Sequence, residues 1–250
     1  IKLCDQYPEG ENIDKDYLAI NPLGTVPAIE IDGNIICGSE EIIYQIDKID
    51  SNNNCSLYPD NIDETDIRKW ASHTTITDGV KFASTLGTIM PVFSSPLLQY
   101  MIKALPFSSI VKILLKHPRN DRKMIFAAMY FGNPSKKIPF MGVSNYADEI
   151  IKLEKLFSDG RNFFYNTFSH VDINLMCVFN RLVDLGLEET VSHKTPFIHA
   201  YWQKLKSRNS YQNGILNYYT DKEKKLLSEF YKNNDSSVLK AILEQIDKKL

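Results

Sequence analysis

The pattern of apolar and polar positions changes near residue 50 of this 250-residue chain. Before that point, short apolar runs alternate with turn residues. The runs at 26–31 and 34–37 flank Asp32-Gly33, which is a strong signal for a β-hairpin turn. From Ser39 the apolar positions recur at helical spacing, so we expect the hairpin to lead into a helix.

Beyond a polar stretch at 50–54, the apolar positions follow a helical period that Pro and Gly residues interrupt. The chain is therefore expected to have an α/β domain at 1–50, a linker at 51–62 and an all-helical domain at 63–250. The expected helices occupy residues 64–82, 96–104, 108–116, 122–131, 147–157, 171–185, 197–207 and 221–250.

Composition and charge narrow the function. The 43% of hydrophobic and 24% of charged residues are typical of a globular rather than a disordered chain. The 29 Lys and Arg residues are balanced by 31 Asp and Glu residues. Because binding to nucleic acid normally needs a basic surplus, we do not expect nucleic acid to be the main partner. The cysteines lack a CxxC spacing and a nearby histidine cluster, so we expect reduced thiols in a cytoplasmic protein without a metal site. They are Cys4, Cys37, Cys55 and Cys177.

Two positions beside the expected hairpin are candidates for ligand binding. Pro27 begins a strand after a Gly-containing turn, and its bond to Val26 is either trans, at a sheet edge, or cis. The cis form would turn the Val26 N–H and C=O outward, where they can pair with an extended, peptide-like ligand. Ser39 is either a plain N-cap or, with the first-turn amides, a site for a carboxylate.

A third pattern is structural. Ser169-His170-Val171-Asp172 precedes an apolar helical run and has the spacing of a capping box, in which Ser169 and Asp172 bond to each other's backbone amides. We expect this box to fix a helix at the centre of the second domain, with His170 at the surface.

Taken together, these motifs resemble those of the glutathione S-transferase superfamily. The layout of residues 82–146 is similar to the branch related to ganglioside-induced differentiation-associated proteins and tetrachlorohydroquinone dehalogenases. The resemblance covers residues 1 to about 215, in the family's order, through the run 17–29, the Asp32-Gly33 turn, Ser39, the interdomain joint Leu57-Tyr58-Pro59, the capping box and the late helix 201–211.

The resemblance implies a thioredoxin-like N-terminal domain and an all-α C-terminal domain of the glutathione S-transferase type. Val26, beside cis-Pro27, would pair with the cysteinyl backbone of glutathione, and Ser39 would hold its γ-glutamyl carboxylate. The implied activity is conjugation or reduction of a small hydrophobic electrophile with glutathione as co-substrate, in a cytoplasmic homodimer. The electrophile would lie against a helix that bears Trp70, His73, Thr74 and Thr77.

Departures from the family pattern bear on that function. Ile1-Lys2-Leu3 resembles the family's second strand, so the first strand and helix, with the catalytic Tyr, Ser or Cys, would lie upstream in roughly 25 to 35 further residues. Gly38 stands where many members have an acidic residue or Gln that holds the ligand, and Ile13 lies near the place of a common basic residue. The catalytic residue is thus unknown. The alternatives are an inactive, naturally truncated chain, a non-enzymatic dimerisation or adaptor protein, and a membrane-associated relative.

The segment from Phe82 to Ile102 has no charged residue. Because Gly87, Pro91 and Pro96 would break a spanning helix, a buried and bent helix is expected there. A local basic run follows, which is either a solvated helix face or a patch for a membrane surface or an acidic partner. Its members are Lys112, Lys116, His117, Arg119, Arg122 and Lys123.

Overall fold

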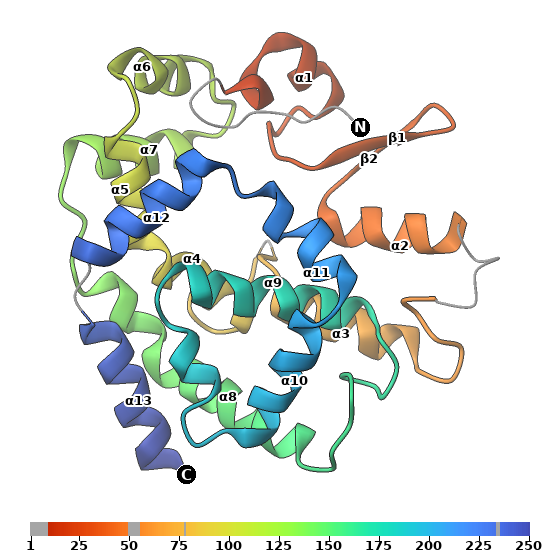
Figure 1. Ribbon diagram of the computed structural model, residues 1–250. Coiled ribbons are helices and arrows are strands. Elements are labelled where there is room, and N and C mark those ends of the chain that lie inside the picture. The colour runs from red at the N-terminus through yellow and green to blue at the C-terminus, as the bar shows by residue number, and fades with distance from the viewer. Residues whose placement is uncertain (1–9, 50–55, 78, 234–235) are drawn as a thin grey trace. The chain divides into compact units, whose positions relative to one another are not determined.

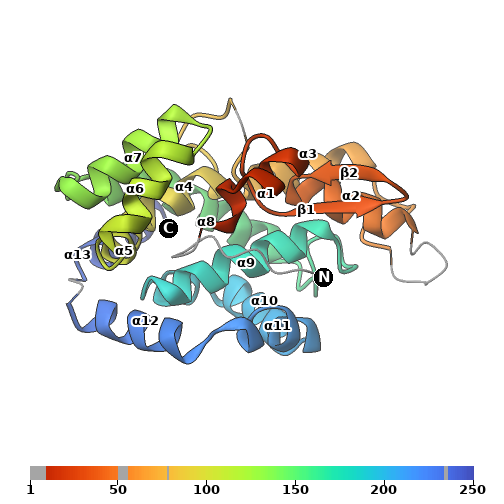
Figure 2. The same ribbon diagram turned by 90° about the horizontal axis from the view of Figure 1, so that it is seen from above.

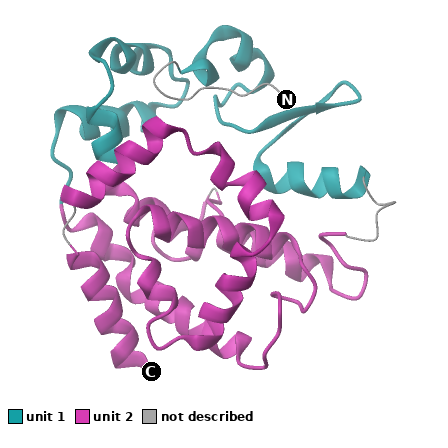
Figure 3. Ribbon diagram, in the orientation of Figure 1, with its two compact units in different colours: residues 1–54, 98–135 teal, residues 55–97, 136–250 magenta. Residues whose placement is uncertain are grey.

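The computed structural model describes residues 10–49, 56–77, 79–233 and 236–250, to which every structural statement below refers. The strand expected at the start of the chain and residues 51–55 of the expected linker lie outside these residues. The chain forms two compact units, coloured separately in Figure 3: unit 1 contains residues 1–54 and 98–135, and unit 2 contains residues 55–97 and 136–250. Residues 98–135, which the sequence pattern assigns to the helical domain, instead form one unit with the N-terminal segment.

Unit 1 contains the expected hairpin. Its strands, β1 (Ala28–Ile31) and β2 (Asn34–Cys37), are antiparallel and are joined by Asp32 and Gly33, whose φ angles are 49° and 79°. Positive φ at both central residues is the requirement of the tightest hairpin turns, and Asp-Gly meets it at low cost. The hairpin follows η1 (Glu11–Ile13) and α1 (Lys15–Ile20) and leads into α2 (Ser39–Ile49), as Figure 1 shows.

Three further helices complete unit 1: α5 (Ser95–Lys103), most of which belongs to this unit, α6 (Phe107–Lys116) and α7 (Asn120–Phe131). Their apolar residues bury Ile13 of η1, in a cluster with Ile102, Ile110, Ile113 and Phe126. The neighbouring Asp14 carboxylate accepts hydrogen bonds from Lys112 and Lys116, both at 3.2 Å. The N-terminal segment and the α6–α7 hairpin thus share one core.

Unit 2 is helical and is built around α9 (His170–Asp184), which is buried along most of its length. Phe157, Phe179 and Trp202 are among its fully buried side chains. The other elements of unit 2 are α3 (Glu64–Thr74), α4 (Leu86–Phe93), η2 (Ile138–Gly142), α8 (Val143–Phe157), η3 (Glu188–Val191), α10 (Pro196–Lys206), α11 (Asn209–Gly214), η4 (Leu216–Tyr218), α12 (Asp221–Asn233) and α13 (Ser237–Lys249).

Two expected helices are shorter than the sequence pattern suggests. The helix expected at 64–82 ends at Thr74. There the Thr74 and Thr75 hydroxyls both donate to the Ala71 carbonyl and compete with the main-chain N–H groups that would continue the helix. The helix expected at 221–250 is instead two helices, α12, which ends at Asn233, and α13, which begins at Ser237.

The uncharged stretch at 82–102 forms two helices, α4 and α5, rather than one bent helix. Pro91 lies inside α4, whose residues are nearly all buried, whereas Phe82 before it is 58% exposed. Among the described helices, none by itself has the length and hydropathy needed to cross a membrane.

Candidate functional site

Val26 and Ser39 lie at the same open end of the β1–β2 hairpin. The Gly38 N–H donates to the Pro27 carbonyl at 3.2 Å, one step beyond the last residue pair of the two strands. Extending that register places Val26 opposite Ser39. The Val26–Pro27 bond is cis, which is one of the two forms that the sequence allows.

The polar groups at this end of the hairpin can serve a ligand. Within the described residues, neither the Val26 main chain nor the Ser39 hydroxyl makes a hydrogen bond. Pro27 and Ser39 are exposed, and Val26 is half-buried. A free main-chain donor and acceptor beside a hydroxyl are the groups that bind an extended peptide with a terminal carboxylate.

Side chains from η1, from α1 and from the residue that ends α1 fix the loop that leads to Val26. The Thr25 carbonyl accepts hydrogen bonds from the Tyr17 hydroxyl at 2.6 Å and from Asn21 Nδ2 at 2.8 Å. Asn12 Nδ2 donates to the Gly24 carbonyl at 2.7 Å. These bonds use the carbonyls of Gly24 and Thr25 and fix the loop in place. The main-chain groups of Val26 itself take no part in them.

Ser39 is the first helical residue of α2 and not its N-cap, which corrects the expectation from the sequence. The Gly38 carbonyl accepts the first helical bond, from the Ile42 N–H at 3.1 Å, so Gly38 occupies the N-cap position. Gly38 has a φ of 90°, in the left-handed region that glycine adopts without strain. The Ser39 hydroxyl is therefore not engaged in capping.

Ile13, near the position of a common basic residue in the resembling family, has a structural role. Its side chain is 2% exposed and belongs to the core cluster of unit 1. Ile13 therefore offers no contact to a ligand at the hairpin, and Gly38 has no side chain to offer. Lys15, the nearest cation along α1, is exposed.

In unit 2, the structure brings Trp70 and His73 together with two residues of α8. His73 Nε2 lies 2.8 Å from the Glu149 carboxylate, and the two rings of Trp70 and His73 meet edge to face at 5.4 Å. Lys152 Nζ lies 4.4 Å from the centre of the Trp70 ring. The sequence did not point to Glu149 and Lys152, because no local pattern connects residues so far apart along the chain.

The two threonines proposed for the same pocket use their hydroxyls within their own segment. Thr74 Oγ1 donates to the Trp70 and Ala71 carbonyls, both at 2.9 Å, and its side chain is buried. Thr77 Oγ1 donates to the Ser72 carbonyl at 2.9 Å. Their role in binding an electrophile stays a prediction.

The capping box at the start of α9 is present. The Ser169 N–H and hydroxyl both donate to Asp172 Oδ2 at 2.8 Å. His170, expected at the surface, is fully buried instead, because the Tyr58 hydroxyl bonds to its Nδ1 at 2.6 Å and the Leu57 carbonyl accepts its N–H. The 57–59 motif therefore packs on the start of α9. Cys37, the last residue of β2, is exposed.

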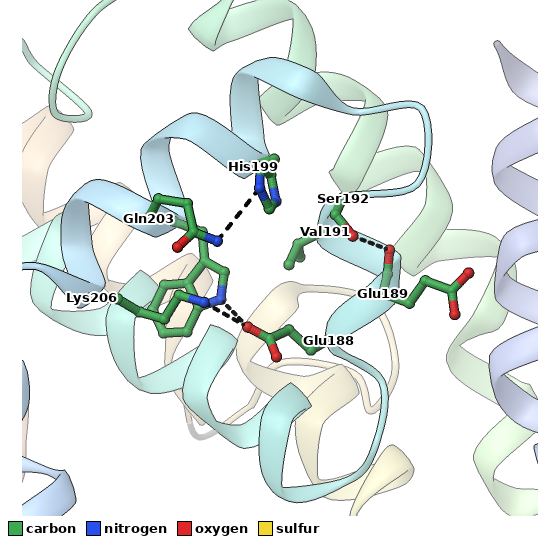
Figure 4. Close-up of a pocket in the computed structure, with 8 residues that line it drawn as sticks. Glu188, Glu189, Val191, Ser192, His199, Gln203 and Lys206 are labelled. Carbon is green, nitrogen blue, oxygen red and sulfur yellow. Dashed lines mark hydrogen bonds and ion pairs between the residues drawn. The ribbon is translucent and has the colours of Figure 1, made fainter.

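A cavity of about 330 Å³ lies between η3 and α10, within unit 2 (Figure 4). At its wall, Glu188 Oε1 accepts from the Trp202 indole N–H at 2.8 Å and from Lys206 Nζ at 2.9 Å. Burial raises the pKa of Glu188, but the bonds from Lys206 and Trp202 outweigh it and hold that pKa below its usual value. The Glu188 carboxylate is therefore already paired within the cavity wall. The cavity contains none of the expected site residues.

Metal binding has no candidate in the described part of the chain, where no group of three or more His, Cys, Asp or Glu side chains converges. The candidate site therefore depends on main-chain groups and a hydroxyl.

The comparisons with known proteins bear on the N-terminal segment and on the fold. Residues 1–49 match the family model described as glutathione S-transferase, N-terminal domain. The chain has a short glutathione S-transferase N-terminal region with a two-stranded sheet in its described residues, followed by a largely helical part, and its fold is glutathione S-transferase-like. The resemblance and the fold class inferred from the sequence are confirmed.

A particular solved structure is similar over nearly the whole chain. The crystal structure of the beta-etherase LigF from Sphingobium sp. strain SYK-6 matches with a TM-score of 0.67 and 16% sequence identity, over 91% of this chain and 86% of that chain. At this identity the likeness establishes the fold. No curated protein matches the chain.

Proposed function

We propose that this protein is a glutathione-dependent enzyme that conjugates or reduces a small hydrophobic electrophile in the cytoplasm. The observation that supports it best is that the Val26 main-chain groups and the Ser39 hydroxyl lie at the same end of the hairpin and make no hydrogen bond within the described residues. Glutathione offers matching groups in one molecule, because its cysteinyl backbone can pair with Val26 while its γ-glutamyl carboxylate accepts from Ser39.

In conjugation, the glutathione sulfur would form a bond to an electrophilic carbon as the leaving group departs with the electron pair of the broken bond. An ether oxygen is one candidate leaving group, since the similar solved structure is that of a beta-etherase. Trp70 and His73 are proposed to contact the electrophile.

The test is a calorimetric titration of the protein with glutathione. Saturable binding at millimolar ligand or below is expected. Ser39→Ala should weaken that binding by about 1–3 kcal/mol, the range for a hydrogen bond to a charged group. Ser228→Ala, which removes an exposed serine of α12, is the matched control and should leave the affinity unchanged. Absence of saturable binding in the unaltered protein would refute the proposal, and an unchanged affinity in Ser39→Ala would remove Ser39 from the site.

A second candidate function is a non-enzymatic dimerisation or adaptor protein with the same fold. The burial of Ile13 and the lack of a side chain at Gly38 favour it, because both remove contacts that hold glutathione in the resembling family. Both candidates predict a homodimer in light scattering, so the glutathione titration separates them. A homodimer that binds glutathione supports the enzyme, and a homodimer that ignores glutathione supports the adaptor.

A further inference from the structure

Helices α6 and α7 of unit 1 expose two rows of large apolar side chains. On α6, Phe107, Val111 and Leu115 recur every four residues, and Phe107 and Leu115 are 60% and 74% exposed. On α7, Met124 and Phe131 are seven residues apart, two turns of the helix, and are 73% and 63% exposed. Single exposed apolar residues are ordinary, but rows at helical spacing on neighbouring helices are not.

The two rows form one surface. The Phe107 and Phe131 rings meet edge to face at 6.5 Å, so the start of α6 lies beside the end of α7. The helices are therefore antiparallel, and both views in Figures 1 and 2 show them side by side. This arrangement places Leu115 and Met124 together at the other end, next to the connecting residues 117–119. We call these four residues with Val111 the α6–α7 surface.

The α6–α7 surface is separate from the faces that hold unit 1 together. Ile110 and Ile113 of α6 and Phe126 of α7 point into the core cluster with Ile13. Unit 1 would keep its core if the exposed rows were made polar, so the exposed rows are available for another role.

Positive charge gathers around this surface. Residues 98–135 contain six Lys and Arg residues and a single acidic residue, Asp121. Lys112 and Lys116 are paired with the Asp14 carboxylate of the same unit, so the positive charge at this surface depends on the others. The connecting loop and the first turn of α7 contribute Arg119, Arg122 and Lys123, beside the exposed Leu115 and Met124 end. Asp121 is already paired with Arg119 at 2.8 Å.

The surroundings of His117, in the connecting loop, shift its pKa. Burial, followed by the charges of Arg122 and Arg119, lowers the pKa of His117. The lowered pKa disfavours the charged form of His117, so the positive charge at this end comes mainly from Lys and Arg.

We propose that the α6–α7 surface binds the interface of an anionic phospholipid bilayer. Exposed aromatic and aliphatic side chains enter the acyl boundary, while flanking Lys and Arg residues pair with anionic headgroups, which is the arrangement of interfacial helices. Insertion across the bilayer does not fit, because α5 and α6 have a suitable combined composition but are bent by 113° relative to each other.

Charge also favours an anionic bilayer over a second copy of the chain as the occupant of this surface. A symmetric dimer through this surface would place two basic faces against each other, which costs free energy through like-charge repulsion. An anionic bilayer instead complements the basic residues and accepts the apolar rows at the same time.

The experiment is co-sedimentation of the whole protein with vesicles of phosphatidylcholine alone and of phosphatidylcholine mixed with phosphatidylserine. We expect binding to the mixed vesicles, weaker binding to the neutral ones, and a loss of binding as the salt concentration rises. Equal binding to both vesicle types, or recovery of all the protein in the supernatant, overturns the proposal.

Variants connect the binding to this surface. The double variant Leu115→Gln/Met124→Gln should weaken binding to the mixed vesicles by about tenfold or more, because two apolar side chains no longer enter the bilayer. Ile76→Gln, which changes an exposed apolar residue of similar exposure in unit 2, is the control and should bind as the unaltered protein does. Equal loss in both variants contradicts the assignment.

The charge variant tests the second half of the proposal. Lys123→Glu should weaken binding by roughly fivefold or more, since one Lys near an anionic surface is worth about 1 kcal/mol. Lys222→Glu on α12 is its matched control. Circular dichroism melts of all variants show that each remains folded. If light scattering finds a dimer that Leu115→Gln/Met124→Gln dissolves, the surface is an interface between copies and the proposal is wrong.

Discussion

At the scale of single residues, Asp172 joins three parts of unit 2. Its Oδ1 accepts from the Phe164 N–H at 2.8 Å and from the Tyr201 hydroxyl at 2.7 Å, and its Oδ2 accepts two bonds from Ser169. The side chain is fully buried. One carboxylate thus satisfies donors from the loop before α9, from the α9 cap and from α10, and each of those donors would otherwise be buried without a partner.

Asp172→Asn is expected to lower the free energy of unfolding by about 2–4 kcal/mol. The new amide nitrogen is a donor and would face a donor, so at least one buried bond is lost outright. Urea unfolding followed by tryptophan fluorescence measures the change, with Asp221→Asn, an exposed acid in the first turn of α12, as control. A loss in Asp172→Asn no larger than in the control contradicts the role described here.

The pH dependence of that difference has a defined sign. Burial raises the pKa of Asp172 above its ordinary value of 3.8, although four hydrogen bonds oppose the shift. The folded state therefore holds this proton more tightly than the unfolded state. The stabilisation that comes from this tighter proton binding is fully present below pH 3.8 and is lost as the pH rises through the raised pKa. The stability advantage of the unaltered protein over Asp172→Asn should shrink across that window, and an advantage that grows contradicts the assignment.

At the scale of elements, α13 is held by both apolar and charged contacts. Ile242 and Ile246 are fully buried. On its exposed side, Asp247 pairs with Lys194 at 2.9 Å and with His193 at 2.8 Å. Exposed ion pairs contribute little because water screens them, whereas a buried isoleucine contributes several times more.

Ile246→Ala should therefore cost about 2–4 kcal/mol of stability. Asp247→Asn should cost much less, because water screens its ion pairs. Thermal or urea unfolding of the two variants provides the comparison. The hydrogen bond from Lys194, followed by that from His193, lowers the pKa of Asp247, so its small contribution is lost only as the pH falls through that lowered pKa. If Asp247→Asn proves the more damaging change, electrostatics rather than packing holds α13.

The elements also show how far a sequence pattern reaches. The hairpin, α2 and the cores of most helices follow from local signals such as Asp32-Gly33 and the helical recurrence of apolar residues. The predicted end of α3 was wrong by several residues, because the apolar pattern continues past Thr74 and does not show that threonine hydroxyls compete for the helix carbonyls there. The surface position predicted for His170 was wrong, because its burial depends on Tyr58, which lies more than a hundred residues earlier in the chain. At the candidate site, Val26 and Ser39 could be chosen from turn and helix-start signals alone.

At the scale of the whole molecule, unit 1 is discontinuous in sequence, and no local pattern predicts that. Ile13 packs with Ile102, Ile110, Ile113 and Phe126, which lie far away along the chain. A periodic pattern shows which face of a helix is apolar, but not which distant segment covers it.

Hydrogen exchange can test the two-unit organisation. Ile110→Ala removes a fully buried side chain of the unit 1 core and should destabilise that unit by about 2–4 kcal/mol. Amides of α1 and α6 should then exchange faster, while those of α9 keep their protection, because local unfolding follows cooperative units. Matched losses in both units would show that they unfold as one.

The discontinuity of unit 1 also has a consequence during synthesis. Roughly a hundred residues separate Ile13 from Phe126, so a ribosome working at about 5–20 residues per second needs roughly five to twenty seconds to deliver the second after the first. Throughout that interval Ile13 has no core to enter, and much of the chain for unit 2 emerges only afterwards. The hairpin region of the nascent chain thus spends seconds with uncovered apolar surface, the period in which a chaperone has something to bind.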